Sequence, residues 1–584
     1  MKREKETYIE YVVLMVFIGI IVYLTLGLKG ANLSQVPIDY VSSGDNITGL
    51  VTAKSMLEHG WIYSNPSIGA PYGVENYDAT TMELLLSVIE QMFVSLTGNW
   101  VLGYNLFYLS AYFLIGITAL YALKKLNISD VIALPLAILY AFVPYHMLRG
   151  TGHLYLGMYF MVPLMVLYLY RLMKEEQLFA KGKMVFQKDK EGWLTVSNIL
   201  RMITLMLMAL TGIYYAFFMC FFLCVVAMYR LLNGDGWKKL RQTGLCVGVV
   251  ILTLLVGALP NVVYWMQNGR AEAVAAKGGE GAELYALKIV QLFLPIPNHR
   301  IGFFAKVREV YDTYYPLVNE NGMASLGVIM SIGFVVLCIV LFVHHKVDRQ
   351  SNLRIGSVFN LAAVLFGTIG GYAVILSFVT GAIRCYNRFS IFIAMFSLIA
   401  IAELLQSFYN KLEKKKWYQG IFALGMLGLL AFGIYDQTTT VLPESYQYQE
   451  ERFYQDREFI QAIENAEIDG AMIYQLPYMR YPENGAIQNM PDYAHFMGYI
   501  HSNDLKWSYG SLAGREGNQW MSALSQLSLE EQLQEMKQVG FAGVYIDWNA
   551  YLPDERTAME VMLESQADDY IQHVDGMKAY YSFY

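Results

Sequence analysis

The sequence predicts a polytopic α-helical membrane protein with a smaller polar domain at its C-terminal end. Of its 584 residues, 55% are hydrophobic and only 16% are charged, and the mean hydropathy is +0.34. Soluble domains have roughly 25% charged residues, so this composition favours a membrane protein. Long apolar runs recur up to residue 435 and then stop. We therefore expect about 11 transmembrane helices, interfacial helices in the first external loop, and a C-terminal extracytoplasmic α/β domain.

The expected helices follow from the thickness of a bilayer core, because crossing about 30 Å takes about 20 apolar helical residues. The run from Leu194 to Leu232 is about twice that length, so we expect it to fold back at "TGIYY", residues 211–215. The spans are expected near residues 11–28, 101–122, 131–147, 154–172, 196–211, 213–231, 243–263, 324–343, 356–379, 388–406 and 418–435.

One further apolar segment, residues 82–98, is nearly long enough to cross. Its residues Glu83, Ser87 and Glu90 share one face of a helix, which is typical of a helix lying in the membrane interface. We therefore expect this segment to be interfacial and do not count it as a span.

Basic loops indicate the orientation of the chain. With about eleven spans and a cytoplasmic N-terminus, the stretches "LKKLN", "RLMKEEQLFAKGKMVFQKDKEG", "YRLLNGDGWKKLR", "HHKVDRQSNLR" and "NKLEKKKWYQ" all fall on one side. The positive-inside rule makes that side cytoplasmic. We expect a plasma-membrane protein with a transmembrane domain of residues 1–435 and an extracytoplasmic domain of residues 436–584. The other large external parts are residues 29–100 and 264–323.

The C-terminal region alternates helix-like stretches with short apolar ones. The stretches "DREFIQAIENA" and "SLEEQLQEMKQVG" have helical patterns, and "GAMIYQLP", "FAGVYID" and "MKAYYSFY" are rich in strand-forming residues. This alternation predicts a small α/β unit.

Several functions are disfavoured by what the sequence lacks. No basic tract indicates nucleic-acid binding, and no P-loop indicates an ATP-driven pump. The five cysteines lie in or beside apolar segments, so no disulfide framework is expected. The cytoplasmic loops are too short for a nucleotide-sugar domain. Any donor must therefore reach the protein through the membrane, already activated.

Ionisable residues gather in the expected external loops. Asp39 and Asp45 lie in the first loop, Arg149 and His153 lie in "PYHMLRGTGHLY", and the pair Arg384 and Arg388 lies in "GAIRCYNRFS". Ionisable groups at membrane depth cost about 2.5–3.5 kcal/mol each, so such a cluster usually serves a site.

Each of these residues also has a structural explanation. The carboxylate of Asp45 could cap a helix, and Arg384 and Arg388 could reach towards anionic lipid headgroups. His153 could pack at the membrane interface. No His, Cys and acid spacing specifies a zinc site.

Three stretches resemble the GT-C superfamily of integral-membrane glycosyltransferases, which use polyprenyl-phosphate sugars as donors. They are "GDNITGLVTAKSMLEHGWIYSNPSIGAPYG", "AFVPYHMLRGTGHLYLGMYFMVPL" and "IRCYNRFSIFIAMF". The resemblance implies that an Asp in the first external loop acts as base, which selects Asp45, with Asp39 in reserve. Some members of the superfamily have a paired-acid form of the motif that could hold a divalent cation, and this form is absent here. A requirement for a divalent cation therefore stays open, and no other cofactor is expected.

The resemblance implies an inverting glycosyltransferase in contact with membrane lipids. Arg384 and Arg388, with Arg149 and His153, would hold the donor phosphate, because guanidinium groups suit phosphate. Alternatives are a translocase for lipid-linked sugars or polysaccharides, and a non-catalytic subunit of a sugar or phosphoglycerol transfer system.

The C-terminal domain is the candidate for acceptor binding. Residues 475–510 resemble the external domain of bacterial sugar or phosphoglycerol transferases, and "LKWSYGSLAGREGNQW", residues 505–520, overlaps their end. Aromatic rings can stack on sugars, and Arg can hold an anionic polymer. We expect a surface polysaccharide or a teichoic-acid-like polymer to bind here. The alternative is that the rings form the core of the domain. The candidate residues are Trp507, Tyr509, Arg515 and Trp520.

Overall fold

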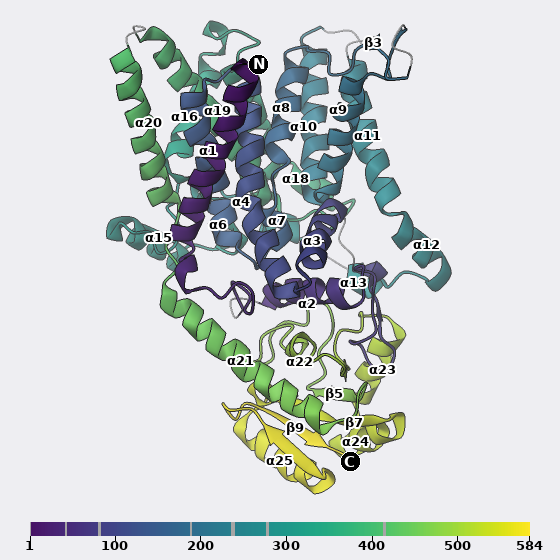
Figure 1. The fold of residues 1–584 in the computed structure, drawn as a ribbon. Coiled ribbons are helices and arrows are strands. Elements are labelled where there is room, and N and C mark those ends of the chain that lie inside the picture. The colour runs from purple at the N-terminus through teal and green to yellow at the C-terminus, as the bar shows by residue number, and fades with distance from the viewer. Residues whose placement is uncertain are drawn as a thin grey trace.

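The computed structural model describes residues 2–40, 44–79, 83–186, 190–234, 240–275, 279–412 and 416–584. The molecule has two layers along its long axis (Figure 1). A bundle of upright helices contains the N-terminus, and a mixed region of helices and a sheet contains the C-terminus. Helix α21 (Pro443–Ala466) runs from the bundle to the sheet.

Six helical segments of the described chain are long and apolar enough to cross a membrane. A seventh results if the bent pair α11 (Arg241–Gly257) and α12 (Leu259–Asn268), which meet at 44°, counts as one span. The six comprise α1 (Lys2–Thr25), α4 (Trp100–Lys125), α5 (Asp130–Ala141) with α6 (Pro144–Arg149), α10 (Ile213–Leu232), η7 (Tyr386–Phe389) with α19 (Ser390–Lys411), and α20 (Lys416–Gln437).

The other four expected spans coincide with shorter apolar helices. These are α8 (Val162–Met173), α9 (Val196–Leu210), α16 (Gly327–Phe342) and α17 (Asn352–Gly367). At about 1.5 Å per residue they are shorter than a bilayer core of about 30 Å. Length and composition therefore show a multi-pass protein with at least six candidate spans among the described residues, and the count of about eleven stays a prediction. The fold-back between α9 and α10 is confirmed, because α9 ends at Leu210 and α10 begins at Ile213.

The first loop after α1 contributes two helices that differ in orientation. Helix α2 (Gly44–Glu58) lies across the end of the bundle, whereas α3 (Leu84–Thr97) stands beside α4 (Figure 1). The turn at Gly98, whose φ is 60°, joins α3 to α4, and a Cβ at Gly103 of α4 would lie 2.6 Å from the Cα of Val94. At 14 residues α3 is too short to cross, as expected. It packs along α4, however, and does not lie flat in the interface.

The C-terminal region is built around a five-stranded mixed sheet with the strand order β6-β5-β7-β9-β8. Strand β5 pairs in parallel with β6 and β7, and β9 pairs antiparallel with β7 and β8. The three stretches expected to be strands are β5, β7 and β9. The strands are β5 (Met472–Leu476), β6 (Lys506–Trp507), β7 (Phe541–Asp547), β8 (Asp569–Gln572) and β9 (Lys578–Ser582).

Helices cover this sheet, and their ends follow the sequence. Helix α24 (Leu529–Val539) begins with a capping box between Ser528 and Glu531 and ends at Gly540, whose φ of 96° favours glycine. The other helices of this region are α22 (Phe496–His501), α23 (Glu516–Leu524) and α25 (Pro553–Gln566).

The C-terminal region is bonded directly to the first loop of the bundle. The ammonium of Lys54, which is buried on α2, donates to the carbonyl of Tyr499 at 2.7 Å and to that of Ser502. The hydroxyl of Tyr40 donates to Asp456 on α21 at 2.9 Å. These bonds fix α2 between the bundle and the C-terminal region, and this position defines the site described next.

Candidate active site

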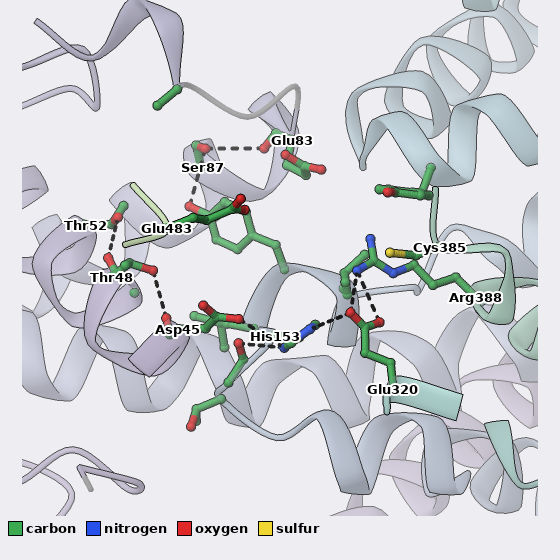
Figure 2. Close-up of a pocket in the computed structure, with 18 of the residues that line it drawn as sticks. Asp45, Thr48, Thr52, Glu83, Ser87, His153, Glu320, Cys385, Arg388 and Glu483 are labelled. Carbon is green, nitrogen blue, oxygen red and sulfur yellow. Dashed lines mark hydrogen bonds and ion pairs between the residues drawn. The ribbon is translucent and has the colours of Figure 1, made fainter. Parts of the chain in front are cut away.

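A cavity of about 720 Å³ lies where the bundle, α2, α3 and the C-terminal region meet. Figure 2 shows Asp45, His153, Glu320 and Arg388 extending across it in a row. Its lining includes residues from distant parts of the chain: Asp45, Thr48, Thr52, Asn76, Glu83, Ser87, Glu90, His153, Tyr155, Tyr214, Tyr285, Glu320, Arg384, Cys385, Arg388, Tyr481 and Glu483. The cavity is large enough for a sugar ring and a phosphate.

Asp45 stands in the first turn of α2, directly after Gly44. A Cβ at Gly44 would lie 2.9 Å from the carbonyl oxygen of Asp492, so the close approach of the C-terminal region requires glycine there. The contact between Asp45 and Thr48 runs from the Thr48 hydroxyl to the main-chain oxygen of Asp45 at 2.8 Å. The carboxylate takes no part in that bond. Its side chain is 58% exposed and faces the cavity.

The surroundings of Asp45 favour proton acceptance. Burial raises the pKa of the Asp45 carboxyl, and the carboxylates of Glu483 and Glu320 raise it further, against the opposing effect of His153. The Nδ1 atom of His153 lies 4.0 Å from Oδ2 of Asp45. A carboxylate with a raised pKa in a cleft is a candidate general base.

Asp39, the reserve base, is placed differently. Its carboxylate accepts a hydrogen bond from the Thr151 hydroxyl at 2.8 Å, and its main-chain oxygen accepts one from the Asn46 amide. Asp39 is not among the residues that line the cavity. Of the two acids, Asp45 is therefore the one with access to a substrate in the cavity.

Three of the four predicted phosphate-binding residues converge on one carboxylate, that of Glu320. Arg388 Nη2 and Arg149 Nη1 each lie 3.3 Å from its Oε2, and His153 Nε2 lies 3.5 Å from its Oε1. The Arg149 side chain is 1% exposed and Glu320 is 19% exposed. Although burial opposes ionisation, the hydrogen bond from His153 and the charges of Arg388 and Arg149 hold the pKa of Glu320 well below its usual range.

Both ring nitrogens of His153 face oxygen atoms. Its Nδ1 lies 2.8 Å from the carbonyl oxygen of Gly152, and its Nε2 lies 3.5 Å from Oε1 of Glu320. The tautomer of the ring decides which nitrogen donates. These contacts hold the imidazole between Asp45 and Glu320.

Arg384, the fourth predicted residue, pairs with a different acid. Its Nη2 lies 3.7 Å from Glu483, which belongs to the C-terminal region, and its guanidinium lies 5.6 Å from the ring centre of Tyr285. A Cβ at Gly281 would meet the Arg384 side chain at 2.8 Å, so this glycine leaves room for it. Arg384, Arg388 and His153 line the cavity, whereas Arg149 stands behind Glu320.

The predicted acceptor-binding residues lie away from the cavity. Trp507 is 1% exposed and its indole N–H donates to Ser502, and Tyr509 is 3% exposed. Neither ring has a free face for a sugar, and they form part of the core, as the alternative interpretation stated. Arg515 binds Asp78 at 2.7 Å, and Trp520 stacks on Phe541 with 6.2 Å between ring centres. The expectation for Trp507 and Tyr509 is corrected because aromatic side chains also fill small cores.

Sequence reasoning missed two acids as site residues. Glu320 lies in the "NENG" stretch at the start of η5 (Glu320–Ala324), and Glu483 lies in the loop after β5. The signal for Glu320 was the polar character of that stretch in an external loop, but nothing in the sequence connects Glu483 to Asp45. In the part of the chain that the structure describes, no group of three or more His, Cys, Asp or Glu residues is arranged to hold a metal ion.

Comparison with solved structures shows the fold that the chain shares with known proteins. The chain is similar to ArnT from Cupriavidus metallidurans in the apo state, at 11% sequence identity, with 99% of this chain and 98% of that chain covered and a TM-score of 0.50. It also matches the archaeal oligosaccharyltransferase AglB from Archaeoglobus fulgidus in complex with an inhibitory peptide and a dolichol-phosphate, at 13% identity, with 99% and 74% covered and a TM-score of 0.44.

A third match is the arabinofuranosyltransferase AftD from Mycobacteria, at 12% identity, with 92% of this chain and 35% of that chain covered and a TM-score of 0.44. These proteins have the GT-C fold, and the likeness to ArnT shows that this membrane protein has it too. The chain belongs to the family described as "Domain of unknown function (DUF6311)", which matches residues 16–375, more than half of its length. No curated protein matches the chain.

Proposed function

We propose that this protein transfers a sugar from a polyprenyl-phosphate-linked donor to a glycan or polymer acceptor on the outer face of the plasma membrane. One observation carries the proposal. A candidate base, Asp45, and the basic side chains of Arg384, Arg388 and His153 open into the same cavity. The GT-C fold agrees with such a reaction. A base beside a cluster of cations matches the two charges that change in glycosyl transfer from a phosphate.

The reaction would proceed by a single inverting displacement. Asp45 takes the proton of an acceptor hydroxyl while the oxygen of that hydroxyl attacks the anomeric carbon of the donor sugar. The bond between that carbon and the phosphate oxygen breaks on the opposite side, and polyprenyl phosphate leaves with its electron pair. Because phosphate is a good leaving group, no covalent enzyme intermediate is needed.

The arginines and His153 would stabilise the charge that grows on the departing phosphate. Arg388 and His153 at present donate to the Glu320 carboxylate. A phosphate offers more acceptor atoms than a carboxylate and can share or take over these bonds. Arg149, buried behind Glu320, would hold that carboxylate in place and set the charge of the cluster.

The proposed topology places the N-terminus in the cytoplasm and the C-terminal region outside, on the basis of the basic loops. The cavity lies at the end of the bundle that meets the C-terminal region, and therefore on the outer side in this orientation (Figure 1). An acceptor on the cell surface would reach Asp45 from there.

The proposal is tested by deleting the gene and complementing it with variants. Deletion is expected to cause accumulation of one lipid-phosphate sugar and loss of that sugar from one surface polymer. Asp45→Asn keeps the shape of the side chain but cannot accept a proton, so transfer is expected to fall by about 10² or more. Asp39→Asn is the matched control and is expected to restore transfer. Full activity of Asp45→Asn in a normally expressed protein would refute the assignment of the base.

A further inference from the structure

The wall of the cavity formed by α3 has a different chemistry from the wall formed by the arginines. Glu83, Ser87 and Glu90, the polar face of α3, all line the cavity together with Tyr155. Figure 2 shows Glu83 and Ser87 on the side of the cavity away from Asp45. Among the described residues that line the cavity, the basic ones are Arg384, Arg388 and His153, and none of them lies on α3.

Glu90 is the residue on this wall that indicates a ligand. It is fully buried, and its Oε2 accepts a hydrogen bond from the Tyr155 hydroxyl at 2.6 Å. Its Oε1 is also buried and has no hydrogen-bond partner in the described part of the chain, although it belongs to a residue that borders the cavity. Burial raises the pKa of Glu90 to about 7 despite the bond from Tyr155.

A buried polar atom without a partner is costly, and most such atoms in folded proteins are bonded or serve a site. A carboxyl group can bind the hydroxyl groups of a sugar, because it accepts hydrogen bonds at both of its oxygens. The neighbouring hydroxyls of Ser87 and Tyr155 lie 3.4 Å apart, and each can donate or accept a hydrogen bond beside Glu90. An acidic sugar would place its carboxylate against Glu83 and Glu90, and the ionised forms of these side chains would repel it.

We infer that the α3 wall is a sugar subsite that accepts a neutral or amino sugar and excludes a sugar acid, with Glu90 as the specificity-determining residue. The inference rests on the proposed function and names the class of sugar that the site takes. The ring could be the one linked to polyprenyl phosphate or the one that carries the acceptor hydroxyl. Both present the same hydroxyl groups to Glu90, and the experiment separates them.

The experiment measures binding to the full-length protein in detergent. The probes are undecaprenyl phosphate alone and the same lipid phosphate linked to glucose, glucosamine or glucuronic acid. Methyl glycosides of these sugars are also added to protein already loaded with undecaprenyl phosphate. In the wild type, glucose and glucosamine are expected to raise the binding affinity about tenfold or more in one of the two arms, the linked-sugar arm or the methyl-glycoside arm. Glucuronic acid is expected to give no such gain in affinity.

Glu90→Gln is expected to remove most of that gain while leaving the affinity for undecaprenyl phosphate within about twofold, because the side chains proposed to bind phosphate belong to other elements and none of their described hydrogen bonds or ion pairs involves Glu90. Tyr155→Phe, which removes one hydroxyl, is the second variant if Glu90→Gln does not fold, and it is expected to lower the same gain. Ser95→Ala, on the exposed face of α3, is the matched control and is expected to change nothing.

The outcomes separate the two hypotheses. A gain in the linked-sugar arm that depends on Glu90 assigns the subsite to the donor, and a gain in the methyl-glycoside arm assigns it to the acceptor. Equal gains in the wild type, Glu90→Gln and Tyr155→Phe, or a gain for glucuronic acid in the wild type, overturn the inference. Failure of the wild type to bind undecaprenyl phosphate contradicts the proposed function instead, and methyl glycosides added without lipid then still test Glu90.

Discussion

Substituting Glu320 with glutamine gives the sharpest test of the cation cluster. The change keeps the size of the side chain and removes the charge that Arg149, Arg388 and His153 share. Removing one partner of a buried ion pair costs about 3–5 kcal/mol, because the other charge is left without compensation. Glu320 is 19% exposed, and solvent reaches part of the cluster. We therefore expect a loss of about 3 kcal/mol, at the lower end of that range.

The same substitution is expected to increase the stability that the folded protein gains from a bound phosphate ligand. In the wild type a phosphate must compete with the Glu320 carboxylate for Arg388 and His153, whereas Glu320→Gln offers these donors without a competing charge. A ligand that binds only the folded state adds about 2.7 kcal/mol of stability at 100 times its dissociation constant. Undecaprenyl phosphate is therefore expected to return most of the lost stability in the variant.

The assay is thermal and denaturant unfolding of both proteins in the same detergent, each with and without undecaprenyl phosphate. The matched control is Glu403→Gln. Glu403 lies on α19 and accepts a hydrogen bond from the side chain of Asn352. This variant should show no change in its response to the lipid. Two results would refute the reasoning: unfolding of Glu320→Gln at the wild-type midpoint, or an equal shift by undecaprenyl phosphate in variant and wild type.

Three other predictions concern the base, the docking of α2 and the topology. The pKa of Asp45 is raised above the usual value of about 3.9, so the carboxylate that accepts the proton is lost at a higher pH than for an ordinary Asp. The transfer rate should therefore begin to fall, as the pH is lowered, at a pH above about 3.9, and this fall should be absent in Asp45→Asn. Lys54→Met should destabilise the protein by about 2–5 kcal/mol, because it leaves buried carbonyls without a donor, and limited proteolysis should then cut the C-terminal region faster. Alkaline phosphatase should be active when fused after Tyr584 and inactive after Lys125, and the reverse pattern would contradict the orientation.

The gathering of Asp45, Arg149, His153, Arg384 and Arg388 could be predicted from the sequence, and the structure brings these residues around one cavity and its Glu320 wall. The reason is physical. Once the spans and the positive-inside rule assign each loop to a side, the ionisable residues of the loops on one side are expected to meet at the same end of the helix bundle. The prediction required only the side of the membrane and no knowledge of how the helices pack.

Glu483 could not be found in the same way, and Glu320 was not selected although its polar stretch lies in an expected external loop. Both lie in irregular segments, at the start of a short 3-10 helix and in a loop, so no periodicity indicates where their side chains point. Their roles depend on contacts across the chain, such as Arg384 with Glu483. Such contacts follow from the packing of whole elements, which local patterns do not contain.

The two corrections have related causes. The aromatic residues Trp507 and Tyr509 lie in or after β6, which is only two residues long, and a strand that short has no alternation from which to tell a buried ring from an exposed one. The polar face of α3 was correctly recognised, but polarity alone does not distinguish a face turned to water from one turned to an internal cavity. Glu90 is fully buried, so the face points inward.

The position of Asp45 depends on both layers of the molecule. Its helix α2 is bonded to the C-terminal region through Lys54, and Glu483 from that region lines the same cavity and pairs with Arg384. A base must stay within hydrogen-bond reach of the proton it takes, and a displacement of about 1 Å can lower a rate by about 10². In the proposed reaction the C-terminal region would therefore act by holding α2 in place through Lys54 and by contributing Glu483 to the wall of the cavity.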